Sequence, residues 1–219
     1  MKLHPTLIGL LVALAASAGS GAASAATNLL VNGGFEDSSS TTVTPPGWFN
    51  FGATNGVLTY SAIPQQPVYE GLRFYDIGAH NNGFASVGVG VGQTFASIAG
   101  ARYKVSFGMS GENVPGSAIE TLRVSAGDTA TDYVLTPNGD PVFTRAMTSE
   151  SFEFTANGSS TTLSFILQAI VGAPGNNDPM FDGVVVELIS APVPEPQTYA
   201  LMAIGLFAVA GAGLRRRRG

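Results

Sequence analysis

Two carboxylates, Glu36 and Asp182, are the side chains of this 219-residue chain whose types and positions best suit metal chemistry. Glu36 follows the turn signal Asn32–Gly34 near the start, and Asp182 precedes a β-prone run near the end. If the first and last strands are neighbours, these carboxylates and nearby loop carbonyls supply the hard oxygen ligands that calcium prefers. The other interpretation is that Asp182 caps a turn while Glu36 is solvated or pairs with an arginine.

A second set of residues suits carbohydrate, because aromatic rings stack on the apolar C–H faces of sugars and polar groups fix the orientation. The competing explanation is that most aromatic side chains of a β-protein belong to its core. The candidate ligand-binding residues are Trp48, Tyr69, Arg73, Tyr75, His80 and Asn82.

Catalysis has few candidates. His80 is the one histidine in the body of the chain, and no sequence logic ties a serine to it as a nucleophile. Paired carboxylates for glycoside cleavage have no local motif here. We therefore expect no enzymatic activity.

Glycine alternates with valine from Gly88 to Gly92, but the third glycine of a dinucleotide-binding fingerprint would fall at Gln93. Glycines at every second position of a strand leave one face bare. The pattern predicts that an aromatic ring or another backbone approaches that face closely.

Composition and charge narrow the class of protein. Cysteine is absent, charged residues make up 11% of the chain, and glycine is abundant with 28 residues, a composition typical of exported β-proteins with many turns. Residues 26–192 carry five basic and fourteen acidic side chains, a net charge of −9. Such a domain repels nucleic acid and anionic membranes, so we expect no nucleic-acid partner.

Alternation of apolar and polar residues at period two predicts strands with one buried face. No helical stripe of useful length interrupts them, and Asn-Gly and Gly-Gly at 32–34 predict a sharp turn through positive φ. Residues 26–191 are therefore expected to form one all-β domain, a two-sheet sandwich of jelly-roll type. The β-prone runs are 28–31, 84–91, 103–107, 122–124, 152–154, 163–167 and 184–188.

The N-terminus has the pattern of a secretory signal peptide. A basic start is followed by an apolar core over 7–18 and by the small residues Ala23 and Ala25 around Ser24. These features predict cleavage after residue 25. An uncleaved membrane anchor is the alternative, although the core is short for a bilayer span of about 20 residues.

The C-terminus, residues 192–219, combines a polar signature, an apolar segment and a basic end. The apolar segment 199–214 is predicted to be a single transmembrane helix that halts in the inner membrane, with the basic end cytoplasmic. At about 1.5 Å per residue it is short for a bilayer, which favours a temporary stop. The signature residues are Val193, Pro194, Glu195 and Pro196, and the basic residues are Arg215, Arg216, Arg217 and Arg218.

Signature, apolar span and basic end, in this order, resemble the PEP-CTERM sorting domain. The resemblance implies export in a Gram-negative bacterium, recognition of residues 193–196 by an exosortase-type membrane protease, and delivery to the cell surface or extracellular matrix. Proteins with this tail typically accompany exopolysaccharide and biofilm.

Residues 28–36, 46–48, 92–95 and 100–107 resemble the galactose-binding-like jelly rolls, which include the DUF642 group and several carbohydrate-binding modules. The run Phe181–Val184 resembles their closing strand, although Gly183 replaces the usual second Asp or Asn. The resemblance implies a structural calcium ion held by Glu36 and Asp182.

Together these patterns predict an exported, non-enzymatic protein that binds or organises exopolysaccharide. A structural matrix protein without specific glycan binding is the alternative, and a hydrolase of exopolysaccharide is the third possibility.

Overall fold

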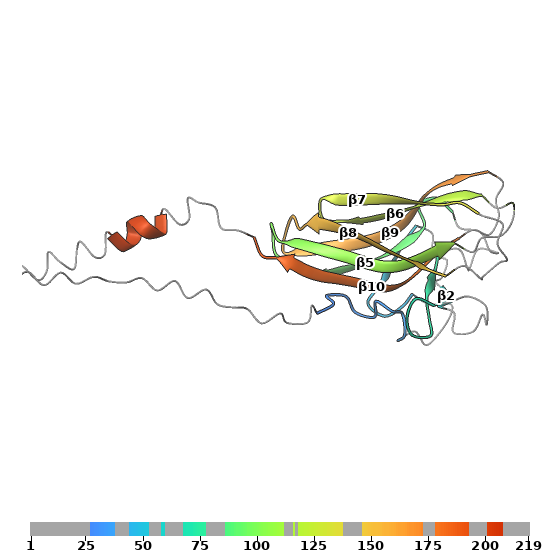
Figure 1. Ribbon diagram of the computed structural model, residues 1–219, viewed down its shortest axis with the longest axis horizontal. Helices are drawn as coiled ribbons and strands as arrows, with labels where there is room; N and C mark the ends of the chain where they lie inside the picture. Colours follow the sequence, from blue (N-terminus) through green and yellow to red (C-terminus); the bar gives the residue numbers. More distant parts are fainter. Residues whose placement is uncertain are drawn as a thin grey trace, which may run out of the picture.

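Two five-stranded antiparallel sheets make up the body of the molecule in the computed structural model (Figure 1). The structure describes residues 27–37, 44–52, 58–59, 68–77, 86–111, 116, 118–137, 146–172, 178–192 and 201–207. The first sheet has the order β1 (Phe49–Phe51), β4 (Gly90–Ala96), β9 (Ser160–Val171), β6 (Ile119–Ala126) and β7 (Thr129–Leu135). The second has the order β2 (Leu58–Thr59), β3 (Tyr75–Asp76), β10 (Pro179–Ser190), β5 (Arg102–Gly111) and β8 (Thr148–Thr155).

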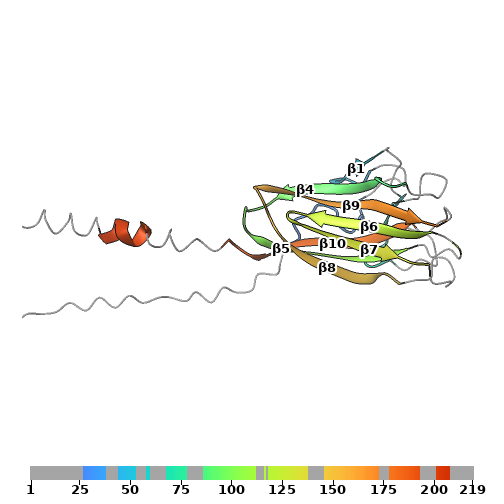
Figure 2. The ribbon, with the colours of Figure 1, turned by 90° about the horizontal axis from the view of Figure 1, so that it is seen from above.

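The sheets pack face to face, and Figure 2 shows the first sheet running from β1 to β7 across the view. Each inner face carries the apolar half of the alternating pattern: Leu122 and Val124 on β6 are buried, whereas Arg123 between them is exposed. This arrangement removes apolar area from water on both sheets at once. The predicted all-β, two-sheet sandwich is confirmed.

Aromatic rings fill the centre of the sandwich. Phe165 of β9 stacks on Phe181 of β10 with ring centroids 4.1 Å apart and planes within 7°. Phe107 of β5 meets the edge of Phe165 at 5.2 Å. Because Phe165 and Phe181 come from different sheets, their stack joins the two layers directly.

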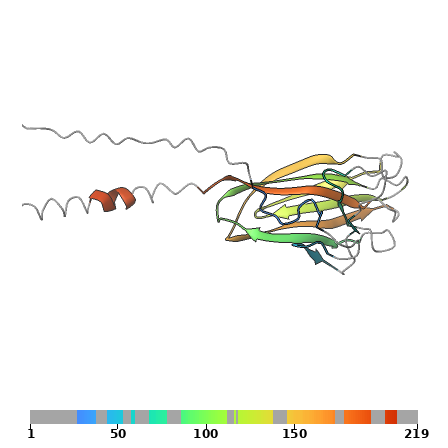
Figure 3. The same ribbon diagram turned by 90° about the horizontal axis from the view of Figure 1, so that it is seen from below.

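The chain start runs beside the last strand, as Figure 3 shows for the blue segment along β10. Leu29 N–H donates to Val186 O at 2.9 Å, and Val184 N–H donates to Gly33 O at 3.0 Å. Residues 28–31 are not a regular strand, in contrast to the prediction, because the Asn28 side chain takes part of the pairing. Its amide accepts from Val186 N–H and donates to Val184 O. The expected proximity of first and last segments nevertheless holds.

The turn after this segment is sharp for a different reason than expected. Positive φ occurs at Asn32 (54°) and Phe35 (58°) and not at the two glycines between them. Glycine is needed at both positions because there is no room for a side chain. A Cβ at Gly33 would collide with the Val184 carbonyl oxygen, and one at Gly34 would lie 2.7 Å from Glu70 Oε1.

Two strand predictions need correction. The run 84–91 was expected to be a strand, whereas β4 begins at Gly90, because a turn occupies 87–88 with Gly88 at a φ of 88°. Strand β7 was not expected, since Thr129–Leu135 mixes polar and apolar residues at the sandwich edge.

In the C-terminal tail the structure describes a short helix at residues 201–207. Within the described part of the chain, no helix has the length and apolar character to cross a membrane. The predicted signal peptide, the sorting signature 193–196 and the basic end 215–218 lie outside the described residues.

Removing the ring of Phe165 should destabilise the domain more than any surface change. We expect Phe165→Ala to lower the free energy of unfolding by about 3–5 kcal/mol, because it empties the stack between the sheets. Phe49→Ala, at a position with 41% exposure, should cost about 1 kcal/mol or less. Chemical denaturation monitored by tryptophan fluorescence gives both values, and equal losses would contradict this description of the core.

Candidate functional site

The outer face of the first sheet is built largely from small and hydroxyl-bearing residues, of which Thr94 and Thr162 are exposed and Ser164 is buried. The strand register places Phe49 beside Gly92, Gly92 beside Ser164, and Ser164 beside Ser125. These four residues form a row across β1, β4, β9 and β6. Apart from Phe49, all of them are small. We call this surface the first-sheet face, defined by Phe49, Phe51, Gly90, Gly92, Thr94, Thr162, Ser164, Arg123, Ser125 and Asp132.

An aromatic pair stands at one end of the first-sheet face. The rings of Phe49 and Phe51 are 5.2 Å apart and tilted by 59°, and Phe49 is 41% exposed. Both rings lean over Gly92, where an added Cβ would lie 2.7 Å from Phe51 and 3.1 Å from Phe49. The prediction that the bare glycine face admits an aromatic ring is confirmed at Gly92. The exposed ring of Phe49, fixed in this way, can stack on the C–H face of a ligand.

Polar groups occupy the rest of the first-sheet face. Thr94 and Thr162 share a hydroxyl hydrogen bond of 2.8 Å across β4 and β9, both at exposed positions. The hydroxyls of Ser125 and Ser164 share one of 2.7 Å across β6 and β9. Each hydroxyl has one proton and two acceptor lone pairs, so a pair keeps capacity to bind a further hydroxyl group.

An ion pair closes the far edge of the face. Arg123 donates to both carboxylate oxygens of Asp132, from Nε at 2.7 Å and from Nη2 at 2.8 Å. This bidentate hydrogen bond lowers the pKa of Asp132 and raises that of Arg123. Both groups are exposed, so the pair contributes little to stability and mainly fixes two polar side chains at the surface.

The two predicted metal ligands converge on one loop, residues 69–73. Asp182 Oδ2 accepts from Tyr69 N–H at 3.0 Å and Glu70 N–H at 2.9 Å. Glu36 Oε1 accepts from Leu72 N–H at 2.7 Å and Arg73 N–H at 2.9 Å. The two carboxylates therefore hold successive parts of the same loop against the second sheet.

Asp182 lies within β10, at a bulge, and is fully buried. Burial raises its pKa to about 7, against the lowering effect of three backbone N–H bonds, and the charge of Glu70 raises it further. A cation near Asp182 would relieve this excess of negative charge.

The fit to calcium is nevertheless partial. The described residues contain no group of three metal-ligating side chains. Calcium takes six to eight oxygen ligands, so main-chain and water oxygens would have to supply most of them around Glu36 and Asp182.

Two predicted stacking residues turn out to be core residues. Trp48 is 7% exposed, packs on Phe35 at 5.2 Å, and donates its Nε1–H to Asn32 O at 3.1 Å. Tyr75 is 3% exposed and stacks on Phe181 at 4.8 Å. Because neither ring has a free face at the surface, the expectation that these two residues stack on sugar is corrected to a role in packing.

Of the other four candidate ligand residues, two lie in the 69–73 loop and two lie outside the described residues. Tyr69 is 43% exposed, with its ring over Gly108 on the outer face of the second sheet, away from the first-sheet face. Arg73 is half-buried in the same loop. His80 and Asn82 lie outside the described residues.

Sequence reasoning missed the Phe49–Phe51 pair as a site. Its signal was present, since two aromatic residues at period two face the same side of a strand, and the bare glycine strand predicted a ring as neighbour. What the sequence lacked was the pairing of β1 with β4, which brings the two together.

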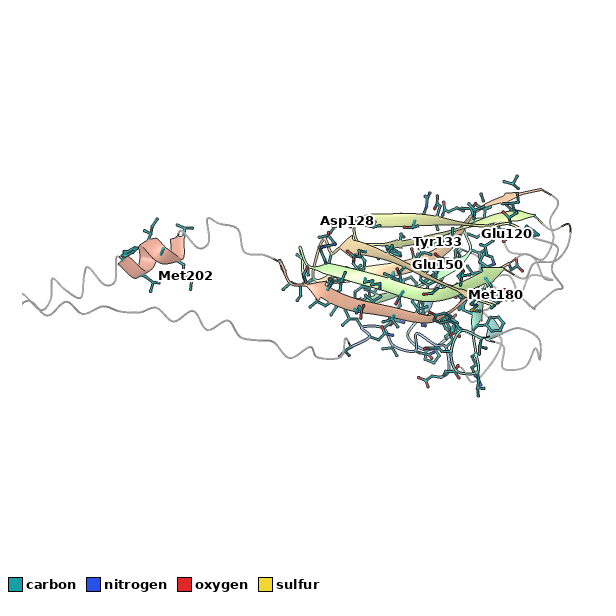
Figure 4. The ribbon with its side chains drawn as sticks, viewed as in Figure 1. Glu120, Asp128, Tyr133, Glu150, Met180 and Met202 are labelled. Atoms are coloured by element: carbon teal, nitrogen blue, oxygen red, sulfur yellow. The ribbon has the colours of Figure 1, made fainter. Side chains whose placement is uncertain are left out.

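A buried acid also escaped prediction. Glu120 of β6 is 2% exposed, and its Oε2 has no hydrogen-bond partner among the described residues. Burial raises its pKa to about 8, and the nearby charges of Asp178 and Asp76 add to the effect. Figure 4 shows Glu120 at the end of the sandwich where β6 begins. This carboxyl group is therefore protonated at neutral pH.

Comparison with solved structures identifies the class of fold. The CBM22-1–CBM22-2 tandem domain of Paenibacillus barcinonensis Xyn10C has a TM-score of 0.52 and 15% identity, over 81% of this chain and 49% of that chain. The single CBM22-1 xylan-binding domain of Xyn10C has a TM-score of 0.48 and 17% identity, over 78% and 99%. The enzymatically active domain of bacteriophage CBA120 tailspike protein 4 has a TM-score of 0.47 and 13% identity, over 74% and 21%.

The similarity to the tandem domain, at 15% identity, is a similarity of fold. The chain is a two-sheet sandwich that resembles carbohydrate-binding modules. Residues 192–218 match the PEP-CTERM protein-sorting motif. This match confirms the sorting motif expected from the tail and implies an exported, sorted protein. No curated protein matches the chain.

The buried Glu120 makes stability depend on pH. Its folded pKa of about 8 lies above the ordinary value, so the folded state holds a proton that the unfolded state releases near pH 4.5, and stability falls as pH rises between those values. Glu120→Gln should remove this part of the slope and stabilise the domain at pH 8 by on the order of 2 kcal/mol.

Thermal unfolding of the protein and of Glu120→Gln at pH 5 and pH 8 measures this difference. Groups far from Glu120 contribute equally to both proteins, so the change in the difference measures Glu120 together with its coupling to Asp178 and Asp76. A difference that does not change with pH would show that Glu120 titrates normally.

Proposed function

We propose that this protein is a non-enzymatic module that binds exopolysaccharide through the first-sheet face. One observation carries the proposal: the Phe49–Phe51 pair is fixed over Gly92 with Phe49 exposed, and two hydroxyl pairs lie beside it, one exposed and one part-buried. Rings to stack on sugar C–H faces and hydroxyls to bind sugar hydroxyls are the two elements of carbohydrate recognition. The fold similarity to a carbohydrate-binding tandem supports it.

The shape of the face suits an extended chain better than a single sugar. The first-sheet face crosses four strands, from Phe49 on β1 to Arg123 on β6. Strands lie about 4.8 Å apart, so four of them span about 14 Å, enough for two or three sugar units. A polysaccharide can therefore contact the rings and the polar end simultaneously.

The sorting tail supplies the route in this proposal. The match over residues 192–218 supports export with a cleaved signal peptide and a transient stop in the inner membrane through residues 199–214. An exosortase-type protease would then process the signature at 193–196. The sandwich would reach the cell surface or the extracellular matrix, where exopolysaccharide of a biofilm is its ligand.

Removing the exposed ring tests glycan binding. We expect Phe49→Ala to weaken retention of the protein in affinity gels that contain exopolysaccharide from the producing cells or xylan, by about tenfold in affinity. The loss follows from the missing stacking surface, because the ring makes little contribution to the core.

The matched control is Tyr69→Ala, which removes an aromatic ring of similar exposure, 43%, from the second sheet. Its retention should equal that of the unchanged protein. Equal losses in both variants, or no retention of the unchanged protein on any glycan, would contradict binding at the first-sheet face. Release of reducing ends from the same gels would show a hydrolase instead.

We also propose that Glu36 and Asp182 hold a calcium ion that fixes the 69–73 loop. The support is the convergence of both carboxylates on this loop and the negative charge gathered by Asp182 and Glu70. The ion would serve stability, since the loop lies on the second sheet and the proposed glycan face on the first.

Chelation tests the calcium proposal. With calcium near a hundred times its dissociation constant, we expect a melting temperature about 5–10 °C above that in chelator. Glu36→Gln should abolish the difference, whereas Glu187→Gln, on the outward end of β10, should preserve it. An identical melting temperature with calcium and with chelator would exclude the ion.

A further inference from the structure

A groove opens along the free edge of the sandwich, where β7 ends the first sheet and β8 ends the second. It encloses about 250 Å³. Residues from β5, β7 and β8 line it, among them Met109, Asp132, Tyr133, Leu135, Thr148 and Glu150. The groove borders the first-sheet face at Asp132, which belongs to both, and its other lining residues come from β5, β7 and β8.

The register explains why a charge and an aromatic ring meet there. Tyr133 pairs with the buried Leu122, and Glu150 pairs with the buried Phe107, so both point to the inner side of their sheets. The ring of Tyr133 meets Phe107 edge-on at 5.5 Å. Figure 4 shows Tyr133 and Glu150 on adjoining strands of the edge.

The described residues that line the groove include the acids Asp132 and Glu150 and no lysine, arginine or histidine. Glu150 accepts one hydrogen bond of 3.2 Å from the Thr148 hydroxyl. Burial and then the Glu150 charge raise the pKa of Tyr133, so the carboxylate acts on the phenol across the groove. Asp132, by contrast, has its charge matched by Arg123.

We propose that this groove binds a sugar unit bearing a free ammonium group, an amino sugar of a cationic polysaccharide. Glu150 receives the ammonium group, the ring of Tyr133 contacts the sugar body, and the Thr148 hydroxyl binds a sugar hydroxyl. The inference rests on the proposed function for the class of ligand, and it adds a second site with its own selectivity.

Size and charge support this choice of ligand. Pockets for drug-sized ligands measure about 300–1,000 Å³, so a groove of about 250 Å³ suits one small unit of a longer chain. A charge-assisted hydrogen bond is about twice as strong as a neutral one. The net charge of −9 over residues 26–192 also attracts a cationic polymer.

A purely structural role for Glu150 is the opposing explanation. Inward-pointing charges on edge strands prevent sheets from pairing with other molecules. That role requires no ligand, and it predicts aggregation when the charge is removed. The two explanations therefore give different experimental results.

Titration of the protein with glucosamine, N-acetylglucosamine and glucose, monitored by amide NMR shifts, tests the proposal. Glucosamine should shift the amides of 132–135 and 148–150, and N-acetylglucosamine and glucose should bind about tenfold more weakly or not at all. Glu150→Gln should reduce glucosamine binding by about tenfold, because it removes the charge and retains the shape.

The control is Glu153→Gln, which removes a charge from the outward side of the same strand. It should leave glucosamine binding unchanged. Equal binding of all three sugars, or aggregation of Glu150→Gln without any glucosamine shift in the unchanged protein, would overturn the amino-sugar site. Loss of glucosamine binding in Glu153→Gln to the same extent would also overturn it.

Discussion

The stack of Phe165 on Phe181 is the contact on which the rest of the molecule depends. The two rings come from the central strands β9 and β10 and lie 4.1 Å apart, which sets the separation of the layers. Phe35 from the chain start packs against Phe181 at 5.8 Å, and Trp48 packs against Phe165 at 6.3 Å. The core therefore absorbs the largest aromatic residues and ties the N-terminal segment to the last strand.

Because the core takes up most of the large aromatic residues, few remain at the surface for binding. Trp48 and Tyr75 are committed to packing, whereas Phe49 and Phe51 lie on the outer side of an edge strand. Gly92 makes room for their rings, so a single glycine couples the packing of β4 to the surface that we propose as the glycan site. The loop held by Glu36 and Asp182 lies on the other sheet, which separates a stabilising site from a binding site.

The sequence was sufficient for features set by local pattern. Period-two alternation predicted the two sheets, and the tail predicted the sorting motif, because both depend on neighbours in the chain. The sequence alone did not predict the features that depend on which strands pair with each other. Trp48 and Phe49 are consecutive, yet one is buried and the other exposed, and that choice follows from the register of β1 against β4. Tyr133 and Glu150 likewise meet through strand order alone. At positions 33 and 34 the sequence predicted positive φ, whereas the glycines are needed because Val184 O of β10 and the Glu70 side chain leave no room for a Cβ.

The central claim is that glycan lies across the outer side of the first sheet. Its most direct test is a crystal structure of the protein with an oligosaccharide released from the exopolysaccharide. The account predicts a sugar ring stacked on Phe49, with the chain continuing over Ser164 toward Arg123. An oligosaccharide bound on the second sheet, around Tyr69, with the first-sheet face empty, would contradict it.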